Sequence, residues 1–296
     1  MTAALRPGLV GCGNMGASIG HRLATAHPLS VFDVDGDRAA RVAADTGATV
    51  APGLPELAAA CDVVVLSLPT EAVSDRVVDV LLEHLASGSA IIETSTVGPG
   101  HIRAQGDRCA PRGVALVDAA ILSGVAEMRA GTTTLLVGGA DEAVRQVTPV
   151  LDALAARQLR LGPLGAGMAA KIGNNAVSHA VMVVLLEAAA MVQSAGVPTS
   201  AFAEMLMGEG SGLTRPLTHR LRERVLGGDY EGGMPTEAAR KDSVLALRLA
   251  EAGQVPMFAI QAAHSVYEIA VAQGLGRDDY AAVAKLWEAW TGRRFD

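Results

Sequence analysis

The stretch Gly11-Cys12-Gly13-Asn14-Met15-Gly16 decides the fold, because it forms a G-x-G-x-x-G sequence between a short apolar run and a helical segment. In that context the first glycine permits a tight turn, the second lets a pyrophosphate approach the backbone, and the third lets helix and strand pack closely. The start of the helix also offers free N–H groups and a partial positive charge to an anion. The sequence therefore predicts a dinucleotide site formed by Gly11, Gly13, Asn14, Met15 and Gly16.

An acidic residue follows where such a site requires one. Asp33 closes the second apolar run, and its carboxylate can accept hydrogen bonds from both hydroxyls of a ribose. The same charge repels a 2′-phosphate, and Asp35 and Asp37 follow it where an arginine would favour that phosphate. We therefore expect NAD as the cofactor, with NADP less favoured. The non-functional alternative is an ordinary glycine turn followed by a solvent-facing aspartate.

Outward from this unit, short β-like runs alternate with amphipathic helical segments through the first half of the chain. We expect strands at residues 8–11, 29–34, 62–68, 90–94, 114–118 and 133–137, and a helix at 141–154. Such alternation builds a doubly wound parallel sheet. After Pro163 the pattern becomes helical throughout. The predicted fold class is therefore α/β, with a Rossmann-like, doubly wound NAD-binding domain at 1–163 and an all-α C-terminal domain at 164–296 for substrate and oligomerisation.

Charge and hydropathy exclude two classes of partner. The 24 basic and 31 acidic residues give a net charge of −7, which argues against a nucleic-acid partner, and no basic run suggests a membrane anchor. The longest apolar stretch, residues 176–192, is interrupted by Ser178, His179 and Glu187. We therefore expect it to form a buried helix, and we expect no membrane partner.

The cysteines and histidines point to neither disulfides nor a metal. Cys12, Cys61 and Cys109 show no pairing pattern, which is typical of a reducing compartment, and the seven histidines show no ligand spacing. No secretory signal is recognised at the N-terminus. We therefore expect a cytoplasmic protein with no metal site.

Two polar loops fall at the ends of predicted strands, where doubly wound folds bind ligands. They are Leu68-Pro69-Thr70 and Thr94-Ser95-Thr96. Their hydroxyls are suited to the ribose and carboxamide of a nicotinamide. Each loop is equally well explained by helix capping, since Ser and Thr are favoured N-caps.

A third feature carries the predicted chemistry. The segment Gly165–Asn175 opens a long, Ala-rich helix, and Lys171 and Asn175 lie four residues apart on one face. Partial burial near a helix N-terminus lowers the pKa of a lysine, which then suits the transfer of a hydroxyl proton. We predict Lys171 as general acid and base, with Asn175 orienting the same oxygen. A lysine that only extends its ammonium to solvent is the alternative.

Taken together, these residues resemble the β-hydroxyacid dehydrogenase family, of the 3-hydroxyisobutyrate dehydrogenase type. The resemblance covers almost the whole chain, through the glycine sequence, Leu68-Pro69, Ser95-Thr96, the segment 118–132, Gly165–Asn175 and Lys241-Asp242. It implies catalysis by Lys171, substrate orientation by Asn175, and cofactor contacts from Leu68, Pro69, Thr96 and Lys241. It also implies a homodimer or homotetramer built through the helices. A surface ion pair is the alternative for Lys241.

This chain departs from the family in its substrate loop, where the family reads D-x-P-V-S-G-G. Leu122 takes the position of the serine, with Ser123 and Gly124 following as the remaining predicted substrate contacts. Met234 replaces the aromatic residue that the family carries seven residues before Lys241. Both changes favour a larger or less anionic substrate.

The function expected is an NAD-dependent oxidoreductase that interconverts a small 3-hydroxyacid and its semialdehyde or ketone. Two alternatives stay open at this point. One is an imine or ketone reductase acting on a less anionic substrate, which Leu122 favours and Lys171 opposes. The other is a non-catalytic dinucleotide-binding protein.

Overall fold

The computed structural model describes residues 5–296 and divides into two compact units, Met1–Ala176 and Val177–Asp296. The first unit holds the sheet and the second is helical, which confirms the predicted fold class. The boundary predicted after residue 163 falls in the loop that precedes helix α8 (Ala166–Ser194), whereas the two units meet within that helix.

The first unit is built on a sheet whose eight strands in residues 5–296 follow the order β3-β2-β1-β4-β5-β6-β7-β8. The strands are β1 (Pro7–Val10), β2 (Ser30–Phe32), β3 (Thr49–Val50), β4 (Val63–Leu66), β5 (Ala90–Glu93), β6 (Ala115–Ile121), β7 (Thr134–Gly138) and β8 (Arg157–Gly162). Strands β1 to β6 pair in parallel, and β7 runs antiparallel to β6. Sequence order changes direction between β1 and β4, so the glycine turn after β1 lies at the point where such sheets bind ligands.

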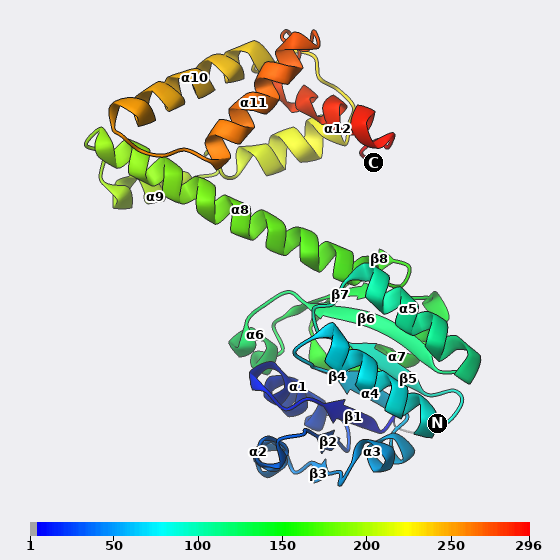
Figure 1. The fold of residues 1–296 in the computed structure, drawn as a ribbon. Helices are drawn as coiled ribbons and strands as arrows, with labels where there is room; N and C mark the ends of the chain where they lie inside the picture. The colour runs from blue at the N-terminus through cyan, green and yellow to red at the C-terminus, as the bar shows by residue number, and fades with distance from the viewer. Residues whose placement is uncertain (1–4) are drawn as a thin grey trace. The chain divides into compact units, whose positions relative to one another are not determined.

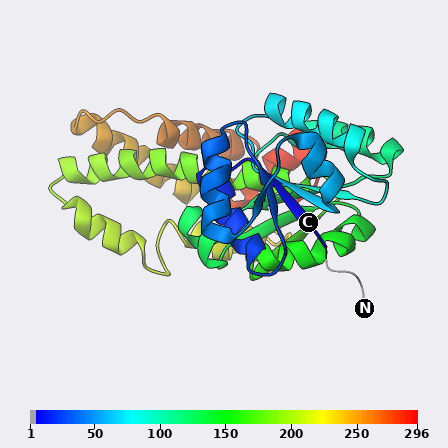
Figure 2. The same ribbon diagram turned by 90° about the horizontal axis from the view of Figure 1, so that it is seen from below.

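Helices cover both faces of this sheet, as Figures 1 and 2 show. They are α1 (Asn14–Ala24), α2 (Gly36–Thr46), α3 (Leu54–Ala60), α4 (Glu71–His84), α5 (Pro99–Cys109), α6 (Val125–Ala130) and α7 (Asp141–Leu154), with a 3₁₀ turn at Ala110–Arg112. Apolar residues of α1, α2, α6 and α7 form one core cluster, and those of α3, α4 and α5 form the other. Successive strand residues alternate between the two clusters, as a sheet buried on both faces requires.

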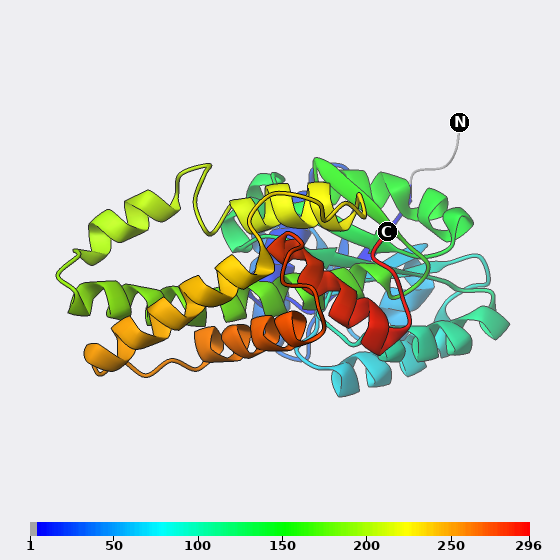
Figure 3. The same ribbon diagram turned by 90° about the horizontal axis from the view of Figure 1, so that it is seen from above.

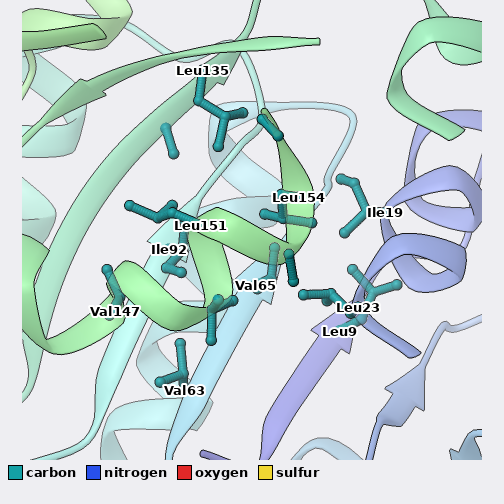
Figure 4. Packing of buried hydrophobic residues seen from close by; sticks show 14 of the residues in the cluster. Leu9, Ile19, Leu23, Val63, Val65, Ile92, Leu135, Val147, Leu151 and Leu154 are labelled. Carbon is teal, nitrogen blue, oxygen red and sulfur yellow. The ribbon is translucent and has the colours of Figure 1, made fainter. Parts of the chain in front are cut away.

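Figure 4 shows the first of these clusters from close by. Ile19 and Leu23 of α1 and Leu151 and Leu154 of α7 pack over strand residues such as Val65, and all five are fully buried. Burying a Val, Leu or Ile side chain stabilises a fold by roughly 1.5–3 kcal/mol. The cluster therefore holds α1, which begins at the glycine turn, firmly against the sheet.

The second unit contains only helices within the described chain. Beyond α8 these are α9 (Thr199–Leu206), a π-helix (Pro216–Val225), α10 (Thr236–Ala252), α11 (Ala259–Ala272), a 3₁₀ helix (Tyr280–Val283) and α12 (Ala284–Thr291). Helices α10 and α11 lie side by side, as seen in Figures 1 and 3. The carboxylate of Glu187 accepts hydrogen bonds from the first backbone N–H groups of α11, at Phe258, Ala259 and Ile260.

Helix α8 corrects one expectation. The apolar stretch 176–192 was predicted to be buried, but only 6% of the most apolar 18-residue window of α8 is buried, and the mean hydropathy of that window is 1.7. By length and composition alone the helix is able to span a membrane. A helix that is apolar on all sides is stable in water only when something covers it. The prediction was wrong because an apolar sequence indicates that a helix needs cover but does not say which surface covers it.

Two further elements escaped the sequence patterns. Strand β3 has two residues and β8 carries two arginines, so neither shows an apolar run. Strand β6 continues to Ile121, three residues past the predicted end at 118. As a result, the predicted substrate loop at Leu122 begins directly at the end of a strand.

Candidate active site

The glycine turn after β1 has the shape that a nucleotide needs. Gly11 has a φ of 96°, and a Cβ added to it would lie 2.1 Å from the carbonyl oxygen of Ser67. A Cβ on Gly16 would lie 2.0 Å from the carbonyl oxygen of Gly11, so helix and turn touch without side chains. A Cβ on Gly13 would meet nothing within 4 Å. The residue predicted to face the pyrophosphate therefore opens onto free space, and no side chain caps the N-terminus of α1.

That space is a pocket of about 480 Å³ lined by the glycine turn, Asp33, Val34, Arg38 and the loop that contains Leu68 and Pro69. The two oxygens of Asp33 accept hydrogen bonds from the backbone N–H groups of Cys12 at 2.6 Å and Asp35 at 2.8 Å. Each oxygen keeps a second lone pair, so the carboxylate retains the capacity to accept ribose hydroxyls. These residues fit a bound dinucleotide.

A second, smaller pocket of about 260 Å³ contains Lys171. Its other lining residues are Met15, Ser67, Leu68, Thr94, Ser95, Thr96, Ile121 and Ser123. Met15, Ser67 and Leu68 line both pockets, so the two are contiguous. Burial lowers the pKa of Lys171, and within residues 5–296 its ammonium makes no ion pair. A cation of lowered pKa thus lies beside the expected cofactor pocket.

Most hydroxyls around this pocket are already engaged. Thr94 donates to the carbonyl of Leu66 at 2.6 Å, and Ser95 Oγ accepts from the N–H of Leu68 at 2.7 Å. Thr70 caps helix α4, since its Oγ1 accepts from the N–H of Val73 at 3.3 Å. Thr96 is exposed and makes no hydrogen bond to the rest of residues 5–296. The loop Leu68-Pro69-Thr70 therefore includes a helix N-cap, and the loop Thr94-Ser95-Thr96 leaves the Thr96 hydroxyl free to bind a ligand.

The residues of the predicted substrate loop have different surroundings. Ser123 lines the Lys171 pocket, and its hydroxyl is 2.6 Å from that of Thr133. Leu122 packs instead against the cluster of α3, α4 and α5, and Gly124 is the N-cap of α6. The position at which the family carries serine thus holds a packing residue here, while the next position brings a hydroxyl to the pocket. The roles of all three in substrate binding stay predictions.

Asn175 and Lys241 are the two other predicted residues. Asn175 is half-buried, one turn after Lys171 on α8, and accepts a hydrogen bond from Asn174 at 3.3 Å. Lys241 belongs to the second unit, is 68% exposed, and pairs with Asp242 at 3.1 Å. Their predicted functions stay predictions.

Two buried carboxylates near the site were missed by the sequence patterns. Asp118 on β6 accepts hydrogen bonds from the N–H groups of Gly165 at 2.7 Å and Met168 at 2.8 Å, so it caps the start of α8. Burial raises its pKa. Glu93, the last residue of β5, is fully buried, and burial raises its pKa to about 6. The available signal was an acidic residue in an apolar strand, at the end of β5 for Glu93 and in the middle of β6 for Asp118.

Two family models match this chain. Residues 6–162 match a family model described as the NAD binding domain of 6-phosphogluconate dehydrogenase. Residues 165–287 match one described as NAD-binding of NADP-dependent 3-hydroxyisobutyrate dehydrogenase. Together the two models span both predicted domains.

Individual relatives match over nearly their whole length. A 2-(hydroxymethyl)glutarate dehydrogenase of Eubacterium barkeri is 30% identical over 99% of this chain and 98% of its own. An NAD-dependent L-serine dehydrogenase of Pseudomonas aeruginosa is 31% identical over 96% and 98%. The solved Mycobacterium tuberculosis 3-hydroxyisobutyrate dehydrogenase with L-serine is 27% identical, with a TM-score of 0.68 over 95% and 98%. A Myxococcus stipitatus imine reductase, 22% identical with a TM-score of 0.83 over 95% and 98%, shares the fold.

Proposed function

The chain belongs to the β-hydroxyacid dehydrogenase family of NAD(P)-dependent oxidoreductases acting on CH–OH groups, and we propose that it interconverts a small 3-hydroxyacid and its semialdehyde or ketone. The observation that carries this proposal is Lys171. Its side chain lines a 260 Å³ pocket that adjoins the dinucleotide-shaped pocket, and its pKa is lowered by burial. This combination suits a group that exchanges a proton with a substrate oxygen.

In this proposal the chain's residues bind the substrate and handle its proton. The nicotinamide, when bound, accepts or supplies the hydride. Lys171 Nζ takes the hydroxyl proton during oxidation and returns it during reduction. Thr96 and Ser123 offer hydroxyls in the same pocket, and Asn175, one turn along α8, orients the substrate oxygen. A lowered lysine pKa serves both directions, because the amine then changes its protonation state closer to neutral pH.

We propose NAD as the physiological cofactor. Asp33 lines the larger pocket with lone pairs available to ribose hydroxyls, and its negative charge opposes a 2′-phosphate. The name of the Pseudomonas aeruginosa relative also specifies NAD.

For the substrate, we propose a small hydroxyacid that carries a carboxylate. The pocket is small, and its lining combines the Lys171 side chain, which is positively charged when protonated, with the free hydroxyl of Thr96, and this combination suits an anion. The relatives named for 2-(hydroxymethyl)glutarate and L-serine act on molecules that carry carboxylates. Because Leu122 packs into the core and Ser123 lines the pocket, one hydroxyl donor is retained in place of the family's serine.

The test is turnover of a panel of 3-hydroxyacids with NAD by the wild type, K171A and K171R. We expect the wild type to reduce NAD with at least one hydroxyacid, and K171A to lose about 10²- to 10⁴-fold in kcat, the contribution of general acid–base catalysis. K171R is the matched control, because it keeps the charge but cannot release its proton. We expect it to be as inactive as K171A in oxidation, while thermal melts confirm that both variants fold.

The pH dependence of kcat also tests the proposed role of Lys171, because its direction differs between oxidation and reduction. Oxidation needs the neutral amine, so its kcat should rise with pH, with a midpoint below the ordinary lysine pKa of 10.5. Reduction needs the ammonium, so its kcat should fall over the same range. Wild-type rates in K171A would remove Lys171 from the mechanism. Turnover of cyclic imines, with none of any hydroxyacid, would replace the proposed function with imine reduction.

We also propose a homodimer or homotetramer in which α8 is covered by a second copy of the chain. Val177, Met182, Val183 and Leu186 on α8 are all exposed in the single chain. The three buried, unpaired cysteines support a reducing compartment, and we propose the cytoplasm.

A further inference from the structure

Glu93 is a buried charged group to which the proposed chemistry gives no part. It closes β5, has no exposed surface, and lies two residues before Ser95 and three before Thr96, which both line the Lys171 pocket. Glu93 itself does not line that pocket. No positive charge compensates its burial within residues 5–296, so hydrogen bonds alone hold it. Burying a carboxylate costs free energy unless hydrogen-bond donors contact its oxygens, so a buried glutamate at this position suggests that it has a role.

The carboxylate is held between the pocket loop and helix α4. Glu93 Oε1 accepts a hydrogen bond from the backbone N–H of Ser95 at 2.9 Å. Glu93 Oε2 accepts from the hydroxyl of Ser74 on α4 at 2.6 Å. Ser74 in turn accepts from Gln105 on α5 at 2.8 Å, so this oxygen is tied to the helical layer. One side of Glu93 thus faces the site and the other faces the scaffold.

The bond to Glu93 fixes the backbone of Ser95, and the hydroxyl of the same residue accepts a hydrogen bond from the N–H of Leu68 at 2.7 Å. Leu68 lies on the other pocket loop and lines both pockets. The chain of contacts from Glu93 through Ser95 to Leu68 therefore joins the two loops that form the shared wall.

We propose that Glu93 is a positioning residue that holds the Leu68–Pro69 and Ser95–Thr96 loops in the shape that binds the nicotinamide end of the cofactor. This rests on the proposed function only in assigning that end of the cofactor to the Lys171 pocket. A carboxylate suits this task because both of its oxygens accept and it never donates. An amide in its place presents its N–H₂ group to the N–H of Ser95 or to the hydroxyl of Ser74, so one of these two bonds is lost and the Ser95 loop is held less firmly. The fraction of chains with the binding-competent loop then falls, and affinity falls with it.

The experiment compares E93Q with S74A, and the readout is NADH affinity by fluorescence titration together with kcat and KM. Ser74 is the matched control, because it is equally buried and bonds the same carboxylate from the scaffold side. We expect E93Q to weaken NADH binding by about tenfold or more, the effect of one badly paired buried donor. In reduction, the KM for NADH should rise and kcat should fall. S74A should lower thermal stability but leave NADH affinity within about twofold.

Each outcome bears on the proposal. Unchanged NADH affinity in E93Q, or equal losses in E93Q and S74A, would reduce Glu93 to a purely structural role. If E93Q does not fold, S95A serves instead, since it removes the link to Leu68 while retaining the Ser95 N–H bond to Glu93. Weakened NADH binding in folded S95A would support the proposal, and unchanged binding would overturn it. NADH binding needs no substrate, so this result stands even if no hydroxyacid is turned over.

Discussion

At the scale of single residues, the proposed preference for NAD over NADP depends on the negative charge of Asp33, and Arg38 is a nearby cation suited to a 2′-phosphate. Both line the larger pocket, and Arg38 is held by an ion pair with Asp35 at 3.2 Å. We expect D33N to raise the KM for NAD, because one ribose acceptor is lost, and to lower the KM for NADP, because a negative charge is removed. The shift in preference should be about tenfold or more, corresponding to one charge-assisted contact.

A second variant at Arg38 tests whether this side chain contributes to the expected gain for NADP. If its guanidinium binds the 2′-phosphate, the double variant D33N/R38A should lose the gain for NADP that D33N shows. R38A alone should leave NAD kinetics close to those of the wild type. A gain for NADP that persists in the double variant would show that removing the charge of Asp33 is sufficient. Steady-state kinetics with both cofactors measure all three variants.

The residues that sequence reasoning identified differ in kind from those it missed. The glycine turn, Asp33 and Lys171 belong to local patterns of spacing, and each lies on one of the two pockets. Glu93 and Asp118 are single acids within apolar strands. Their importance arises from partners 19 to 50 positions away, such as Ser74 and Met168. Only the folded chain brings those partners together, so an acid in an apolar strand marks the position in the sequence but does not reveal its role.

At the scale of elements, the start of α8 depends on Asp118. Its two oxygens accept from Gly165 and Met168, and a Cβ on Gly167 or Gly138 would lie within 2.8 Å of this carboxylate. The absence of those side chains lets strand and helix approach closely enough for the cap. Lys171 lies only three residues after Met168, so the cap also fixes the helix turn that carries the proposed catalytic amine.

We therefore expect D118N to lower the free energy of unfolding by about 1–3 kcal/mol, since its amide cannot accept from both N–H groups. It should also lower kcat while leaving the KM for NAD almost unchanged, because α8 shifts while the glycine turn that binds NAD remains intact. D141N is the matched control, made in the first turn of α7, where the side chain is 84% exposed and should change stability by less than about 0.5 kcal/mol. Urea unfolding and steady-state kinetics check both variants. An unchanged kcat in a destabilised D118N would separate the cap from catalysis.

Element prediction succeeded where apolar periodicity is strong and failed where it is weak. The strands around the glycine turn and the helix Asp141–Leu154 have long apolar patterns, and the structure shows them close to their predicted bounds. Strands β3 and β8 are exposed or partly exposed along much of their length, so their sequences show no such pattern. Both lie at the edges of the sheet, where one neighbour is missing and burial is incomplete.

At the scale of the whole molecule, the exposed apolar surface of α8 needs a cover. Its most apolar window is 6% buried, and exposed patches of this kind mark interfaces. The choice between a second copy and a membrane follows from the polar residues on the helix. Ser178, His179 and Glu187 interrupt its apolar surface, and the carboxylate of Glu187 is occupied by the start of α11. A protein interface accommodates such groups more readily than lipid does.

The proposed assembly makes a prediction about mass. The wild type should elute without detergent at twice or four times its 30.3 kDa chain mass, as measured by light scattering after size exclusion. L186E introduces a carboxylate on α8 where the side chain is 59% exposed, and a symmetric interface receives this change twice. Its dissociation constant should rise at least about 100-fold, because burying an unpaired charge costs several kcal/mol. V50E, made at an exposed apolar residue of β3, should keep the wild-type mass. A monomeric wild type, or one that needs detergent to stay in solution, would rule out the second copy as the cover of α8.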